Sequence, residues 1–240
     1  MTSAHPRTPP EVPQPAGVRR AAAADATDIT AVADVLATAF ADTPLRVLLA
    51  GNRIARNAVL RRAFAGLAGW ACVHGAVYLH ATGAGAAIWL PAQQPPSGPP
   101  QYHPHRAPDG PDTADDAIDT ALLELGAATA DAPGLDTLAS VLYPSAVLPE
   151  ATAAPAYLIA VGADPDAQRE GVARQLLDVH HQYLDATLGT AHALAIDPVG
   201  RRLLTATGYQ PHRVDQPAAG LAVQWMRRPP HPGGQDGAAW

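Results

Sequence analysis

The chain has 240 residues, an apolar fraction of 48% and a net charge of −6, which suits one domain with a full hydrophobic core. The negative charge argues against nonspecific nucleic-acid binding, which needs clustered positive charge to displace counterions. The lone cysteine, Cys72, excludes an intramolecular disulfide and a cysteine zinc cluster, and no window reaches the roughly 18 apolar residues of a membrane span. We therefore expect a cytoplasmic protein with no membrane or nucleic-acid partner and no metal.

Three proline-rich segments delimit the ordered part of the chain. Residues 1–16 and 229–240 are predicted to be disordered tails, because such segments neither form helices nor bury apolar surface. Residues 91–117, rich in Pro, Gly and His, are predicted to form a long mobile loop. Residues 17–228 are therefore predicted to form a single domain that contains this loop.

The first part of the domain predicts a strand, two helices and a hairpin. Residues 18–22 are β-prone, and Asp25 is a suitable N-cap for a helix that Pro44 ends. Residues 76–81 and 86–90 are β-prone runs on either side of a glycine-rich turn. The second helix is predicted from one apolar face with helical spacing, which consists of Leu60, Ala63, Phe64, Leu67, Ala68 and Ala71.

Two further helices are predicted around residues 118–125 and 135–142, ahead of the clearest pattern in the chain. Tyr157–Ala163 is a continuous apolar run, typical of a strand that is buried on both faces. A helix is predicted from near Gly171 to about Thr187, and Ala191–Ile196 is the next strand.

The last elements are a short helix and an antiparallel pair of strands. Asp197 is expected to cap a helix that starts at Pro198, and Gly208 is a typical glycine after a helix end. Tyr209–Val214 and Leu221–Arg227 form the strand pair. This order of elements predicts an α/β (α+β) fold with a mixed sheet, rather than an all-parallel one.

The segment Gln168–Ala173 lies between the buried strand and the helix and matches the pattern Gln/Arg-x-x-Gly-x-Gly/Ala. The first four backbone amides of a helix lack an internal partner and carry partial positive charge. Gly171 and the small Ala173 would let an anion approach these amides closely. The segment therefore predicts a diphosphate site, although the bare motif also fits a helix that merely starts with glycine.

In this context the sequence resembles the GNAT acetyltransferase superfamily, whose central cassette has the same order of buried strand, Asp-Pro break, loop and helix. Phe40–Pro44, Ala86–Pro91 and Val161–Pro165 look like the subgroup that includes puromycin N-acetyltransferase. The resemblance covers roughly residues 18–228. It implies a GNAT fold, in which the central sheet is mostly antiparallel, splayed at its middle and flanked by helices.

The resemblance also implies acetyl-CoA as co-substrate, with its pantetheine arm along the buried strand and its diphosphate in the loop. The implied reaction is direct transfer of an acetyl group to the amine of a small molecule, by a monomer or homodimer. The implied cofactor-binding residues are Val161, Gly162, Ala163, Gln168, Arg169, Glu170, Gly171, Val172, Ala173 and Arg174.

Three positions depart from the family pattern. Leu204 stands where relatives often carry a tyrosine that protonates the thiolate, and Leu194 stands where related members place a glutamate. Glu170 stands where a basic residue is common, and its carboxylate would oppose the phosphate charge. Two functions therefore stay open: an active N-acetyltransferase, and a catalytically degenerate GNAT domain that binds CoA as a sensor or partner-binding module.

The histidines and tyrosines supply the candidates for proton transfer. His192 lies on the strand face that can reach the cleft, so it is the candidate general base. Tyr157 and Tyr143 are possible proton donors. His180, at the centre of an apolar helix stripe, is predicted to be a core histidine, and His181 is predicted to be at the surface.

Overall fold

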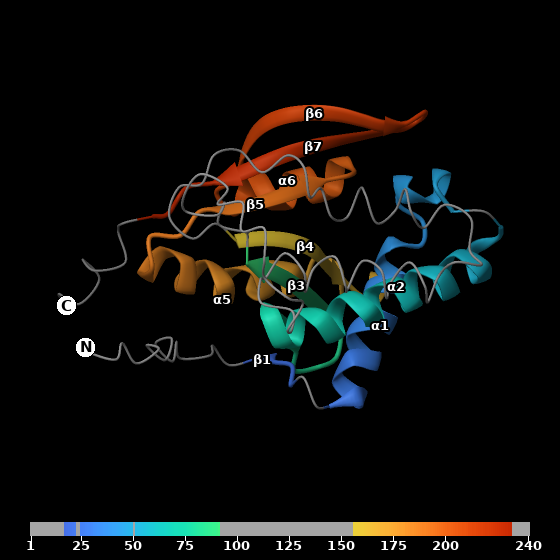
Figure 1. Ribbon diagram of the computed structural model, residues 1–240, viewed down its shortest axis with the longest axis horizontal. Coiled ribbons are helices and arrows are strands. Elements are labelled where there is room, and N and C mark those ends of the chain that lie inside the picture. The colour runs from blue at the N-terminus through green and yellow to red at the C-terminus, as the bar shows by residue number, and fades with distance from the viewer. Residues whose placement is uncertain (1–16, 23–24, 50, 92–155, 232–240) are drawn as a thin grey trace, which may run out of the picture.

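The computed structural model in Figure 1 describes four stretches of the chain, residues 17–22, 25–49, 51–91 and 156–231. The predicted tails lie outside these stretches apart from a few residues, as do nearly all of the predicted loop and the two helices predicted after it. Within the described stretches, no helix combines the length and hydropathy that a membrane span requires.

One seven-stranded sheet organises the described residues, with the strand order β1-β2-β3-β4-β5-β7-β6. Strands β4 and β5 run parallel, and every other neighbouring pair is antiparallel. The mixed, mostly antiparallel sheet confirms the fold class that the sequence predicts. The strands are β1 (Val18–Arg20), β2 (Ala76–His80), β3 (Gly85–Pro91), β4 (Ala156–Ala163), β5 (Ala191–Ala195), β6 (Gln210–Ala218) and β7 (Leu221–Arg228).

Helices cover both faces of the sheet, and each face has its own buried core. Helices α1 and α2 pack on one face, whereas α5 and α6 pack on the other (Figure 1). The helices are α1 (Ala26–Phe40), α2 (Arg53–His74), α5 (Val172–Ala186) and α6 (Pro198–Ala206), with short 3₁₀ turns η1 (Pro44–Val47) and η2 (Pro165–Ala167).

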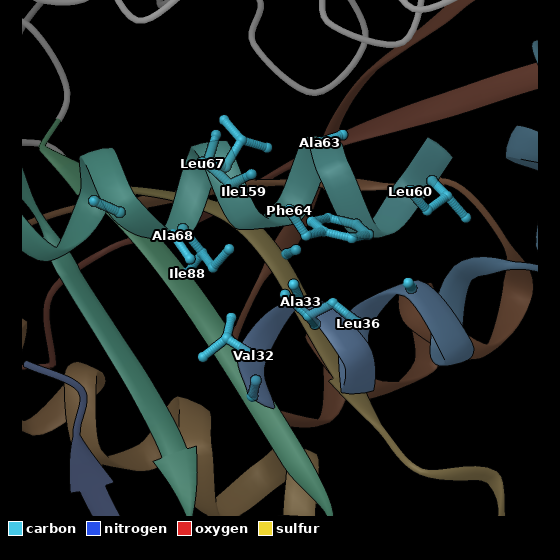
Figure 2. Close-up of a cluster of buried hydrophobic side chains, with 14 of the residues drawn as sticks. Val32, Ala33, Leu36, Leu60, Ala63, Phe64, Leu67, Ala68, Ile88 and Ile159 are labelled. Atoms are coloured by element: carbon cyan, nitrogen blue, oxygen red, sulfur yellow. The ribbon is translucent and has the colours of Figure 1, made fainter. Parts of the chain in front are cut away.

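Figure 2 shows the core beneath α1 and α2. The six apolar residues predicted for one face of α2 are the residues that this helix buries. Phe64 lies among them and belongs to the same core as Ile88 of β3 and Ile159 of β4. Because full burial of such a side chain is worth about 1.5–3 kcal/mol, this stripe fixes α2 against the sheet.

Aspartate caps begin two of the helices, as the sequence predicts. Asp25 accepts a hydrogen bond from the Thr27 amide at 2.8 Å, and Asp197 accepts one from the Gly200 amide at 2.6 Å. Each cap satisfies a backbone donor that the helix itself leaves unpaired.

The buried face of α5 is broader than the sequence pattern predicts. His180 is buried as predicted, with its ring stacked on Trp89 at 4.1 Å between centroids and its Nδ1 hydrogen-bonded to the Tyr78 hydroxyl at 3.2 Å. His181 is also buried, and its Nε2 lies 3.1 Å from the Tyr209 hydroxyl. The surface prediction for His181 is wrong because the chain that follows α6 covers a second side of α5.

Burial lowers the pKa of His180 and His181 to about 3 and that of His192 to about 4, from about 6.5 in an unfolded chain. Below about pH 6.5 the unfolded state therefore binds more protons than the folded state. As the pH is lowered through this range, the free energy of unfolding decreases. When the pH is lowered from about 7.5 to about 5.5, each of the three histidines should reduce the free energy of unfolding by about 1.4 kcal/mol. Urea denaturation at the two pH values measures the combined loss. His181→Asn should remove about a third of this loss, and an unchanged loss in that variant would contradict this account.

Two glycines of the β2–β3 hairpin should respond differently to substitution. A Cβ on Gly85 would lie 2.3 Å from Cγ1 of Val172 in α5, whereas a Cβ on Gly83, at φ +75°, meets nothing within 4 Å. Gly85→Ala should lower the free energy of unfolding by about 3 kcal/mol through overpacking. Gly83→Ala should lower it by only about 1 kcal/mol through backbone strain. Chemical denaturation of both variants checks the difference, and equal losses would show that α5 does not constrain this end of β3.

Candidate functional site

A cavity of about 610 Å³ opens where β4 and β5 separate. The two strands pair only from Ala156–Leu158 to Ala191–Ala193, although β4 continues to Ala163. The walls come from the C-terminal end of α1, from β4, from the loop before α5, and from β5 and α6. The splayed sheet that the family resemblance implies is therefore present, and it encloses a hollow.

A β-bulge in β4 lies at the point of separation. In the register with β3, Leu158 faces Trp89 and Ala160 faces Ile88, so Ile159 has no partner residue in β3. Ile159 and Ala160 consequently both face the core of α1 and α2, instead of alternating between the two faces. Because a bulge bends and twists its strand, it turns β4 away from β5 and leaves the cavity edge of residues 159–163 unpaired with β5.

The loop before α5 has two left-handed residues, Arg169 at φ +79° and Gly171 at φ +81°. Gly171 is the N-cap of α5, and the first intrahelical bond runs from the Gln175 amide to the Gly171 carbonyl at 2.9 Å. The amides of the first turn thus have no acceptor within the helix. Left-handed residues that alternate with right-handed ones can turn successive amides into a concave anion site, and this loop has two left-handed residues two positions apart.

In the described part of the chain, three basic residues contribute to the lining of the cavity. They are Arg169, Arg174 and Arg202, and of the described residues in the lining only Asp197 is acidic. Glu170, whose carboxylate was expected to oppose a bound phosphate, is not in the lining. The charge around the cavity therefore suits an anionic ligand. In the described stretches, no group of three or more His, Cys, Asp or Glu residues is placed to hold a metal ion.

The structure gathers nearly all the residues predicted from sequence around this one cavity. Leu194 and Leu204, at the positions of the missing acid and base, also line it. The predicted cofactor-binding residues in the lining are Val161, Gly162, Ala163, Gln168, Arg169, Gly171, Val172, Ala173 and Arg174.

Of the candidates for proton transfer, His192 does not line the cavity, whereas Tyr157 does. The two residues are register partners across the parallel pair of strands. His192 is buried, and burial together with the charge of Arg227 lowers its pKa to about 4, so that its imidazole is neutral near pH 7. Tyr143 lies outside the described residues.

We compared the sequence and the structure with known proteins. No protein-family model matches the sequence, and no curated protein matches it at a significant level. A structure of histone acetyltransferase HPA2 and related acetyltransferase from Corynebacterium glutamicum is 19% identical, covers 90% of this chain and 96% of its own, and superposes with a TM-score of 0.56. The chain has a GNAT acetyltransferase fold.

Two other structures overlap a similar share of the chain. A protein assigned to the GNAT family from Desulfovibrio desulfuricans is 16% identical over 88% of this chain and 97% of its own, with a TM-score of 0.49. An agmatine N-acetyltransferase is 14% identical over 88% of this chain and 98% of its own, with a TM-score of 0.42.

Several lining residues of the GNAT fold escaped the sequence analysis. Arg202 and Leu203 come from α6, and Phe40 and Thr43 from the end of α1 and the turn after it. A signal for the α6 pair was present, because a helix that starts directly after β5 must direct one face toward the opening, and residues spaced three or four apart from Val199 share that face. Phe40 and Thr43 lie in the segment Phe40–Pro44, which carries part of the family resemblance, but the sequence assigns neither residue to the site.

Proposed function

We propose that this protein is a CoA-dependent N-acyltransferase that transfers an acetyl or related acyl group to a small-molecule amine. One observation carries the proposal: the same cavity is lined by the edge of β4 that does not pair with β5 and by the loop in which Arg169 and Gly171 are left-handed. An unpaired strand edge can hydrogen-bond an amide-containing arm, and a nest of amides can bind a diphosphate. CoA contains both groups on one molecule.

The residues present fit this ligand. The amides from Gly171 to Arg174 would hold the diphosphate, and Arg169, Arg174 and Arg202 would add charge-assisted hydrogen bonds. The backbone of Val161, Gly162 and Ala163 would hydrogen-bond the pantetheine arm. Such an arrangement holds the thioester close to where β4 and β5 part.

In the proposed reaction the amine nitrogen attacks the thioester carbonyl carbon, the N–C bond forms, the C–S bond breaks and the thiolate leaves, while the nitrogen gives up a proton to water or to a base. The amide of the bulged residue Ile159 is a donor for the developing oxyanion. A thiol has a pKa of about 8.5, so the thiolate can leave without an acid at the position of Leu204. His192 does not line the cavity. If it acts as the base, the proton of the amine must reach it through Tyr157 or through water.

A second function, a CoA-binding GNAT domain without turnover, is favoured by one observation. Leu194 and Leu204 both line the cavity, so two positions beside the proposed thioester have no group that can transfer a proton. General acid–base help is worth about 10²–10⁴-fold in rate. The proposed resemblance to the puromycin N-acetyltransferase subgroup rests on short sequence segments alone and adds no preference for an acceptor.

Thiol release separates the two functions. An acyltransferase should release CoA thiol from acetyl-CoA in the presence of at least one member of a panel of small primary amines, above the rate without amine. The rate should rise with pH as the amine loses its proton. Calorimetric binding of acetyl-CoA with no amine-dependent thiol release across the panel would select the binding domain instead.

The loop assignment predicts that Gly171→Glu weakens CoA binding by at least about tenfold, because a carboxylate at the helix N-terminus repels the diphosphate. Gly171→Ala should have a smaller effect, since it adds the strain of φ +81° without the charge. Gly83→Ala, which carries a comparable strain outside the cavity lining, should bind CoA like the wild type. Isothermal titration calorimetry with CoA measures all three, and an unchanged affinity in Gly171→Glu would remove the basis of the proposed function.

A further inference from the structure

The two ends of the cavity have different chemistry. At the loop end, beyond Ala163, the lining holds Gln168, Arg169 and Arg174. The closed end lies where β4 and β5 still pair, at Leu158 and Ala193. Five residues of β4 separate the two ends, or about 17 Å at 3.3 Å per residue. A CoA molecule with its diphosphate at the loop would therefore direct its sulfur toward the closed end.

The lining residues at or next to the last strand pair are apolar, with Tyr157 as the one polar side chain among them. The wall at this end is continuous with the two cores of the protein: Leu158 and Leu204 belong to the core beneath α5 and α6, and Ile159 belongs to the core beneath α1 and α2. Leu158, Ile159, Leu194 and Ala195 lie at or next to the last pair of residues. The apolar lining continues along the end of β5 and α6 with Ile196, Leu203 and Leu204.

This wall is larger than an acetyl group needs. An acetyl group offers a single methyl, which can contact only a few of these seven side chains. Leu194, Ile196 and Leu203 are half-buried, so they keep apolar surface that a ligand could remove from water. Each methylene buried against such a wall contributes up to about fourfold in affinity.

We propose that the closed end of the cavity binds the chain of an acyl-CoA longer than acetyl, a straight-chain acyl group from butyryl upward. This inference rests on the proposed function, since the diphosphate in the loop is what aims the thioester at the apolar end. Leu194 and Leu204 then act as specificity-determining residues, and their side chains form the surface that contacts the acyl chain.

The experiment measures how affinity depends on chain length, without any need for an acceptor. The probes are CoA and its S-ethyl, S-butyl, S-hexyl and S-octyl thioethers, which cannot be hydrolysed or transferred, and binding is measured by calorimetry. The wild type should bind S-hexyl-CoA at least about fivefold more tightly than S-ethyl-CoA, a gain well below the full methylene value. A smaller gain, or a loss, overturns the inference.

The variant Leu194→Gln tests the wall itself. Leu194 is half-buried and glutamine is close to leucine in size, so the substitution adds a polar group with little change of volume. The ratio of S-hexyl-CoA to S-ethyl-CoA affinity should fall by at least about half, because the amide dipole opposes burial of the chain. Ile54→Gln, at an exposed apolar residue of α2 outside the lining, should keep the wild-type ratio. An unchanged ratio in Leu194→Gln, with the fold verified by circular dichroism, overturns the assignment.

Failure of this inference differs from failure of the proposed function. If CoA itself does not bind, the proposed function fails. If CoA binds but the chain-length ratio stays flat, only the acyl preference fails, and the apolar end is left for the acceptor. S-octyl-CoA that binds Gly171→Glu as tightly as the wild type would reveal chain binding independent of the loop, which also overturns the inference.

Discussion

Strands β4 and β5 run parallel but share only three residue pairs before they separate. Parallel strands normally continue their ladder, because an unpaired buried backbone group costs free energy comparable to a lost hydrogen bond. Here the bulge at Ile159 turns β4 away, and the loop and α6 fill the ends of the gap without closing it. The cavity and the positions proposed for the diphosphate and for the acyl chain all depend on this early separation.

Much of the fold could be predicted from the sequence, because its signals are local. The apolar stripe of α2 has strict helical spacing, and Asp25 and Asp197 stand directly before helices as caps. The continuous apolar run in β4 predicts a strand covered on both faces, which the two separate cores explain. The order of these elements around the loop at Gly171 sufficed to locate the candidate site on the chain.

Other features depend on tertiary contacts that leave no local trace. Ile159 and Ala160 read as ordinary strand residues, and only the register with β3 reveals that both face the same side. Arg169 adopts a left-handed conformation that sequence patterns associate with glycine. His181 is buried because residues nearly thirty positions away in the sequence, including Tyr209, fold over α5. The departures at Leu194 and Leu204 were visible in the sequence, but their common position at one apolar end was not.

Gly162 makes the two sides of the opening mechanically unequal. A Cβ on this glycine would lie 2.8 Å from Cβ of Ala39 and 3.2 Å from Cδ2 of Leu36, so α1 rests directly on the backbone of β4. This side of the cleft is constrained, because α1 packs directly behind β4 and leaves no space into which the strand could move. The opposite side of the cleft consists of β5 and the nine-residue helix α6, whose Val199 is exposed. A larger ligand must therefore widen the cleft by displacing α6, while β4 keeps its position and holds the ligand in the same place along the strand.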